Sequence, residues 1–126
     1  LMLLKAASEK FGRQLVHEQE VLSNISDCII QVYAAESVVL RLKKMESYKS
    51  EEEFTLYKDM ADVFVGDAAA RIRKFALDAS YSIESEDFTE LLVNGIEHFT
   101  WTRGFNTKEA RRRIADKLIE ENRYCY

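Results

Sequence analysis

The chain has 126 residues, of which 47 % are hydrophobic and 32 % charged, a length and balance that fit one soluble domain with its own core. With 4 glycines and no proline it is unsuited to turn-rich β architectures, and its net charge of −4 disfavours non-specific nucleic-acid binding. No apolar run approaches the roughly 18 residues that a membrane span requires.

The start of the chain and its two cysteines predict its origin and compartment. The sequence opens with Leu-Met-Leu-Leu, directly in a helical pattern and without a signal-peptide layout, so we expect a piece of a longer protein. Cys28 lies inside a predicted helix and Cys125 is next to last. This placement is typical of reduced thiols in the cytoplasm rather than of a disulfide scaffold.

The first two predicted helices cover residues 1–16 and about 19–45. Leu1, Leu4, Phe11 and Leu15 lie on roughly one side of the first, which Gly12 weakens by about 1 kcal/mol relative to alanine. In the second, steps of three and four residues predict a buried stripe along a bundle helix. The stripe consists of Leu22, Ile25, Ile29, Val32, Glu36 and Val39.

Glu36 is the charged residue within this stripe, and we expect it to be a buried polar group. A carboxyl group in that position must be paired, hydrogen-bonded or protonated. Two interpretations stay open. Glu36 acts as a desolvated general base, or it pairs across the helices with a lysine, an arginine or a tyrosine hydroxyl.

The remaining helices follow from start signals and periodicity. Ser50 and Glu53 form a capping-box pattern before a helix over about 51–80, and apolar spacing predicts a fourth helix over 88–101. Asn106 and Glu109 repeat the capping pattern before a last helix. We therefore predict an all-α, up-and-down bundle in one domain over 1–126, with four long helices and a shorter C-terminal helix.

Candidates for catalysis or metal binding are poor. His17 and His98 lie far apart and have no ligand-spaced partner, so we predict ordinary surface histidines and no metal site. The chain has no glycine-rich phosphate loop, and nothing local supports a nucleophilic triad. We predict no catalytic residue.

The last segment differs in charge from the rest of the chain. From Arg103 to Arg123 there are seven basic and four acidic residues, a local excess of positive charge in an acidic chain. A basic helix can bind an anionic membrane or an acidic partner, or it can pair with the chain's own acids. The candidate interaction surface consists of Arg111, Arg112, Arg113 and Lys117, for which we expect weak membrane binding at most.

Several segments resemble acyl-CoA dehydrogenases. The string KFGRQLVHEQ, followed by Ile25 and Asp27, is similar to that family's F-G-x-x-L-x-x-x-Q signature and its later acidic triplet. Residues 33–37 resemble its Y-x-x-E-S, and residues 66–72 resemble its Ser/Gly-acid-Ala-Ala segment. The resemblance covers about Phe11 to Phe75. Its cofactor-site signature is carried here by Phe11, Gly12 and Gln19.

Departures from the family pattern concern the flavin. The family has an arginine for the flavin diphosphate three residues before the phenylalanine, where this chain has Ser8. The glycine-rich segment expected after the third helix reads ALDASYS, and the Arg-Asp and Tyr-Glu-Gly-Thr elements are missing. The resemblance therefore implies a degenerate motif, with no cofactor bound by these residues.

The pattern is most similar to the extra C-terminal helical domain of very-long-chain-type acyl-CoA dehydrogenases, a domain that resembles a degenerate copy of the family's catalytic helical bundle. The resemblance implies a parent flavoenzyme with FAD, which oxidises an acyl-CoA thioester to the 2,3-enoyl-CoA. This part would pack on the catalytic domain, close the substrate side, or contact a partner or membrane, with homo-oligomerisation left open. Two alternatives remain: a free-standing helical interaction module, and a flavin-binding bundle with altered motifs.

Overall fold

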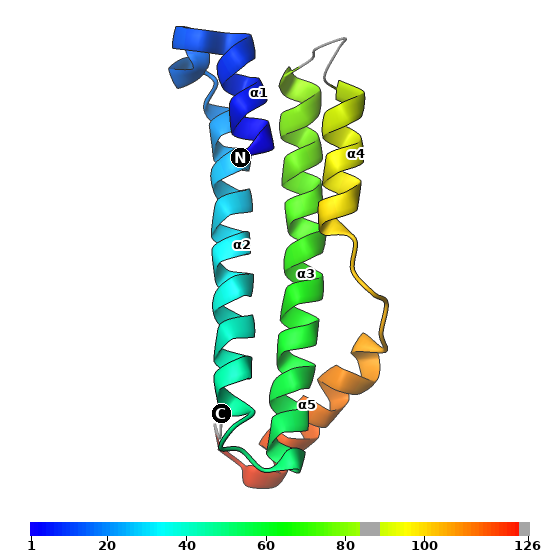
Figure 1. Cartoon of the computed structure of the whole chain (residues 1–126). Coiled ribbons are helices and arrows are strands. Elements are labelled where there is room, and N and C mark those ends of the chain that lie inside the picture. The colour runs from blue at the N-terminus through cyan, green and yellow to red at the C-terminus, as the bar shows by residue number, and fades with distance from the viewer. Residues whose placement is uncertain (84–88, 124–126) are drawn as a thin grey trace. The chain divides into compact units, whose positions relative to one another are not determined.

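The computed structural model describes residues 1–83 and 89–123, and over these residues every regular element is helical (Figure 1). The prediction of an all-α fold is thus confirmed for the described part of the chain. Phe88, the predicted start of the fourth helix, and Cys125, predicted to be a reduced thiol, lie outside the described residues. In chain order the elements are α1 (Met2–Phe11), the 3-10 helix η1 (Gly12–His17), α2 (Gln19–Met45), α3 (Glu51–Ile83), α4 (Thr89–Thr100) and α5 (Thr107–Glu121).

The helices differ from their predicted lengths mainly near the N-terminus. α2 and α3 are long, with 27 and 33 residues, whereas α1, α4 and α5 have 10, 12 and 15. The first helix ends at Phe11 because Gly12 takes a positive φ of 51°, a conformation that glycine adopts without steric cost. The chain then continues as the 3-10 helix η1 instead of extending α1 to residue 16.

The chain divides into two compact units, and α2 and α3 each contribute to both. The first unit comprises Leu1–Tyr33 and Ala68–Thr102, and the second comprises Ala34–Asp67 and Arg103–Tyr126. The first therefore contains α1, η1 and α4 with the first half of α2 and the second half of α3. The second contains the other halves of α2 and α3 together with α5.

The core of the first unit draws residues from four helices. Small side chains predominate where α2 meets α3, and the Cys28 thiol donates to the backbone carbonyl of Ile72 with a sulfur–oxygen distance of 3.6 Å. Such a contact requires the helix backbones to approach closely, which alanines on α3 permit. The buried residues are Leu3, Ala6, Ala7, Val21, Ile25, Cys28, Ala76, Ala79, Ile83, Leu92 and Ile96.

The buried face of α2 lies about one residue before the face that the sequence predicted. Val21, Ile25 and Cys28 are buried, whereas Ile29 is 58 % exposed. Glu36, predicted to be a buried polar group, is exposed, so the structure corrects that prediction. The reason is that the apolar surface of α2 is wide, and the part of it around Cys28 packs against α3.

The first residues of α3 and the start of α5, both in the second unit, are fixed by helix start signals. The Ser50 hydroxyl accepts a hydrogen bond from the Glu53 amide at 3.3 Å, and the Glu53 carboxylate accepts one from the Ser50 amide at 3.4 Å. This reciprocal pair confirms the predicted capping box. At α5, the Asn106 side chain accepts from the Glu109 amide at 3.2 Å. Both helices thus begin where the sequence signals predicted.

We expect Ile96→Ala to lower the free energy of unfolding by about 2–5 kcal/mol, as large-to-small changes in a core do. Ile96 is only 3 % exposed. Ile29→Ala, on the exposed side of α2, should change it by no more than about 0.5 kcal/mol. Urea unfolding of the two variants measures this difference. Equal losses would contradict the rotation of α2 in the structure.

An exposed ion pair between α3 and α4 adds a small, pH-dependent contribution to the stability of the first unit, because both side chains are 48 % exposed and solvent screens their attraction. Arg73 donates two hydrogen bonds to Glu97, one of them from Nε at 3.0 Å. These bonds hold the pKa of Glu97 below its ordinary value of 4.5. A carboxyl group with a lowered pKa stabilises the fold above that ordinary value, and the contribution disappears as pH falls through the lowered pKa.

We therefore expect Arg73→Gln to destabilise the chain at neutral pH and to have progressively less effect as pH falls toward about 3. Urea midpoints across this pH range measure the effect. Arg71→Gln is the matched control, because Arg71 is an exposed arginine on the same helix. A loss caused by Arg73→Gln that stays constant with pH would contradict the role given to Glu97.

Candidate functional site

Within the second unit, an arginine–aspartate pair attaches α5 to α3. Arg113 donates from Nε and Nη2 to the two carboxylate oxygens of Asp59, at 2.7 and 2.8 Å. The Asp59 side chain is 13 % exposed, against 51 % for Arg113. The hydrogen bonds to Asp59 raise the pKa of Arg113, so the guanidinium stays charged. A nearly buried carboxylate is thus held by a two-pronged, charge-assisted contact.

The other basic residues of α5 also have acidic partners. Arg111 donates from Nη2 to both carboxylate oxygens of Asp67, at 3.1 and 2.9 Å, which is a second link to α3. Within α5, Arg112 pairs with Glu109 at 3.3 Å and Lys117 with Glu121 at 3.0 Å. The structure therefore favours pairing with the chain's own acids for the basic surface predicted from the sequence.

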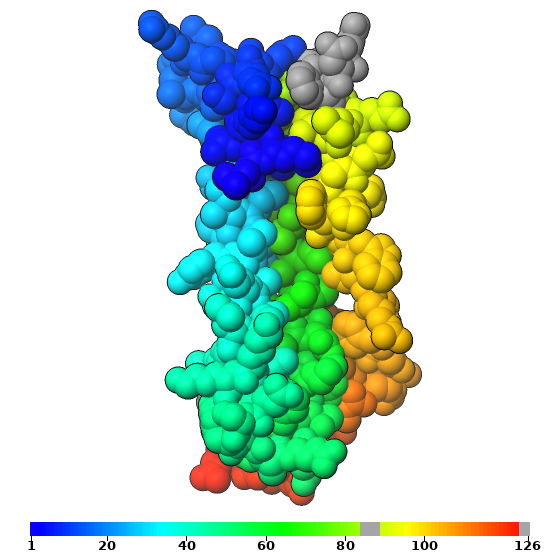
Figure 2. Space-filling model, in the orientation of Figure 1, coloured from blue at the N-terminus to red at the C-terminus, as the bar shows by residue number. Residues whose placement is uncertain are grey.

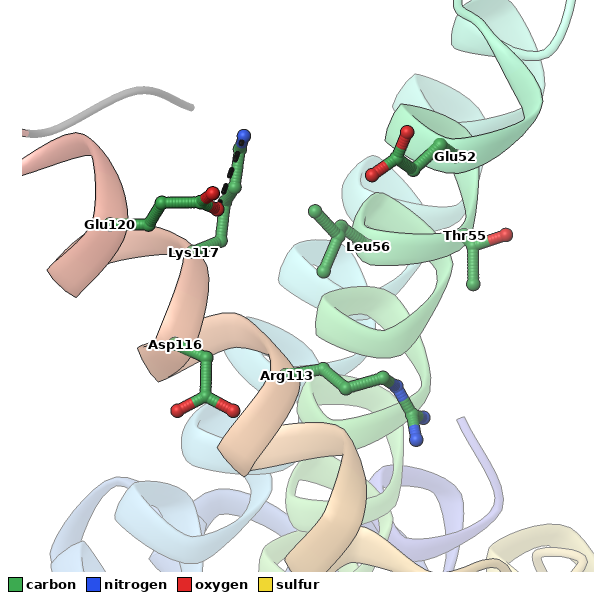
Figure 3. A pocket seen from close by; sticks show the side chains of 7 residues that line it. All are labelled: Glu52, Thr55, Leu56, Arg113, Asp116, Lys117 and Glu120. Carbon is green, nitrogen blue, oxygen red and sulfur yellow. Dashed lines mark ion pairs between the residues drawn. The ribbon is translucent and has the colours of Figure 1, made fainter.

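A surface hollow of about 350 Å³ lies between α5 and the first turns of α3 (Figure 3). Arg113 and Lys117 alternate there with carboxylates, and Figure 3 shows the ion pair between Lys117 and Glu120. Positive and negative groups are interspersed, so the hollow has no concentration of one charge that would select an anion or a cation. Its lining residues are Glu52, Thr55, Leu56, Arg113, Asp116, Lys117 and Glu120.

An apolar groove of about 320 Å³ runs between α2 and α3 in the same unit. Its walls are thioether, aliphatic and aromatic side chains, and its polar groups come from an arginine and a tyrosine. The ring of Tyr57 also lies under the Lys49 ammonium, 5.3 Å from it. The groove is lined by Val38, Arg41, Leu42, Met45, Tyr57, Met60, Ala61 and Phe64.

Sequence reasoning missed the aspartates that receive the α5 arginines. Asp59 and Asp67 are eight residues apart, so they lie on one side of α3 about two turns from each other. This spacing on a helix otherwise rich in apolar residues was the available signal. It identifies a polar strip, but the choice of arginine partner depends on the position of α5.

Two of the three residues of the degenerate signature have roles in the fold. Phe11 and Leu15 pack against the core of the first unit, and Gly12 supplies the turn that ends α1. Gln19 is exposed at the first residue of α2. The fold thus accounts for Phe11 and Gly12 without a ligand.

The described residues contain few groups suited to catalysis. They include no cluster of three or more histidine, cysteine or acidic side chains that could hold a metal. His17 and His98 are exposed, and His98 stacks edge-on against Phe99 at 5.2 Å. Burial raises the pKa of the Cys28 thiol, which makes it a poor nucleophile. In this part of the chain, no helix is long and apolar enough to cross a bilayer.

Comparison with known proteins identifies the family. The model of the acyl-CoA dehydrogenase C-terminal domain matches residues 1–98, more than half of the chain. The chain belongs to this family. A probable acyl-CoA dehydrogenase of Bacillus subtilis (strain 168) is 27 % identical over 118 residues, which cover 94 % of the chain and 20 % of that protein. This acyl-CoA dehydrogenase-related chain therefore spans about a fifth of its relative's length.

A solved structure matches this member of the family along its whole length. The crystal structure of an acyl-CoA dehydrogenase complexed with FAD from Bacillus anthracis superimposes with a TM-score of 0.91 and 30 % identity. The match covers 100 % of this chain and 22 % of that one. The helical fold is thus that of one segment of a much larger dehydrogenase.

We expect Arg113→Gln to destabilise this acyl-CoA dehydrogenase domain more than Arg111→Gln. Removing Arg113 leaves the nearly buried Asp59 carboxylate without its partner, whereas Asp67 is 45 % exposed and can be solvated. Urea midpoints at neutral pH give the order. Adding Asp59→Asn to Arg113→Gln should recover part of the loss. A larger loss for Arg111→Gln would contradict this assignment.

Proposed function

We propose that this chain is the C-terminal helical domain of a longer FAD-dependent acyl-CoA dehydrogenase of the very-long-chain type. The observation that carries the proposal is the match along the whole chain to about a fifth of an FAD-complexed acyl-CoA dehydrogenase. In the parent enzyme, a base removes the α-proton of the acyl thioester while a hydride passes to the flavin. We assign both of these tasks to the rest of the parent enzyme.

The residues around the degenerate signature do not fit a flavin diphosphate. A hollow of about 550 Å³ on α1 is lined by Leu1, Met2, Leu4, Lys5, Ser8 and Glu9. Ser8 contributes no charge, and the Lys5 ammonium is 3.8 Å from the Glu9 carboxylate. A diphosphate requires cationic or amide donors, whereas Glu9 would repel it. The role of this domain is therefore packing on the catalytic portion of the parent enzyme.

Because basic residues of α5 pair with acids of the same chain, we favour docking onto the parent enzyme over membrane attachment as the main role of this domain. Arg111 and Arg113 already contact aspartates on α3, and the only large apolar side chain of α5 that is strongly exposed is Ile119, among the residues described. Interfacial helices combine free basic residues with aromatic side chains on the apolar face. We therefore assign to α5 the task of completing the second unit.

We expect the full-length protein that carries this segment to contain FAD and to oxidise acyl-CoA thioesters, and the 126-residue chain to purify colourless. Visible flavin absorbance and reduction of an electron-accepting dye measure both properties. FAD bound stoichiometrically by the chain alone would contradict the degenerate-copy assignment. A full-length protein without flavin would instead indicate a helical interaction module.

A further inference from the structure

α2 carries a second apolar stripe on its exposed side. Leu40 is 58 % exposed and Val39 37 %, and the preceding turns carry Ile29, Val32 and Tyr33 at 58, 53 and 73 %. Counted from Ile29, these residues stand at intervals of 3, 4, 10 and 11, which place them on one side of a helix. We call this set, together with Glu36 and Lys43, the outer stripe.

A row of large apolar side chains exposed to this extent is typical of a surface that packs against another element. A helix that is apolar on two sides normally lies between two layers, because each apolar side gains free energy on leaving water. On the adjoining side, α2 buries Val21, Ile25 and Cys28 in the core of the first unit. Side chains of α2, drawn in light blue to cyan-green, lie at the surface in the space-filling view (Figure 2). Contiguous exposed apolar side chains of this kind are typical of interfaces.

The missing occupant is best sought in the rest of the polypeptide. The chain corresponds to 20 % and 22 % of the two dehydrogenases it matches, so about four-fifths of a relative lies outside it. That length is ample to supply a covering helix. The charge pattern also fits a protein partner, because the exposed Glu36 carboxylate stands in the middle of the stripe. Inserting a carboxylate into lipid is unfavourable, whereas a lysine or arginine on a partner helix can pair with it.

A second copy of the chain fits less well. Two antiparallel α2 helices bring the most apolar side chains together when their midpoint is Glu36, since Val32 then faces Leu40 and Tyr33 faces Val39. The same register places the two Glu36 carboxylates opposite each other. Two like charges at the centre of an apolar interface repel and are desolvated together.

We propose that the outer stripe of α2 is the surface on which this domain docks onto an apolar helix of the flavin-binding portion of its own polypeptide. A basic side chain of that helix meets Glu36. The inference rests on the proposed function, since it requires a parent dehydrogenase. It goes beyond the proposed function in naming α2 as the surface through which the domain docks.

Thiol reactivity tests the inference. In a Cys125→Ser background, Leu40→Cys places a reporter on the outer stripe, and Ile119→Cys, at a site 75 % exposed on α5, is the matched control. The native Cys28 is buried and hydrogen-bonded, so its reaction is slow. The rate of modification by a disulfide reagent is measured in the 126-residue chain and in the full-length, flavin-containing protein. Circular dichroism confirms that each variant is folded.

The expected result is protection of one reporter only. In the full-length protein Leu40→Cys should react at least about tenfold more slowly than in the isolated chain, while Ile119→Cys should change by less than about threefold. Adding Glu36→Lys should reduce the protection of Leu40→Cys, and Glu36→Gln should reduce it less. Protection that follows the Glu36 charge would support an ionic contact at the interface.

Three outcomes overturn the inference. Equal reactivity of Leu40→Cys in both proteins would mean that the stripe stays exposed. Protection of Ile119→Cys to the same extent would assign the contact to α5. Protection in the isolated chain that grows with protein concentration would identify a second copy as the occupant. A full-length protein without flavin is a separate result, because it refutes the proposed function.

Discussion

The close approach of α2 and α3 in the first unit determines which side of each helix is buried. A sulfur–oxygen contact of 3.6 Å between Cys28 and the Ile72 carbonyl is compatible only with small side chains at the crossing. Ala76 and Ala79, which are 3 % and 0 % exposed, supply them. A bulky residue at position 28 would separate the two helices. The rotation of α2 in this unit, and hence the exposure of Ile29, follows from this contact region.

In the second unit the comparable constraint is electrostatic. α5 has one buried residue, Ala110, so apolar burial alone holds it weakly on α3. The bidentate contact of Arg113 with Asp59 adds a directional link, and Arg111 adds a second one to Asp67. Such contacts specify orientation more than they add stability, since exposed ion pairs contribute little and buried ones must compensate for desolvation.

The sequence predicted where each helix begins and ends better than it predicted which side of the helix is buried. Capping at Ser50 and Asn106 depends on atoms three residues apart, so local pattern suffices, and the positive φ of Gly12 follows from its lack of a side chain. The burial of Glu36 was mispredicted because the apolar surface of α2 is wide. Judged by hydrophobicity alone, the side with Ile29 and Val32 is predicted to be buried. Close packing of α2 on α3 instead buries the side with Cys28. Pairing of Arg113 with Asp59 spans 54 residues, and no local rule selects it.

Residues that match the dehydrogenase signature have roles in the fold of this chain. The position that departs from the signature concerns the ligand. Phe11 and Leu15 pack on the core and Gly12 ends α1, so each has a task in any helical domain of this design. Ser8, at the position where the resemblance implies a diphosphate-binding arginine, is exposed. A copy relieved of cofactor binding would lose the ligand residue first and retain the packing residues. A contact with the rest of the polypeptide would likewise account for the apolar character of the outer side of α2, where Leu40 and Tyr33 are exposed in this chain.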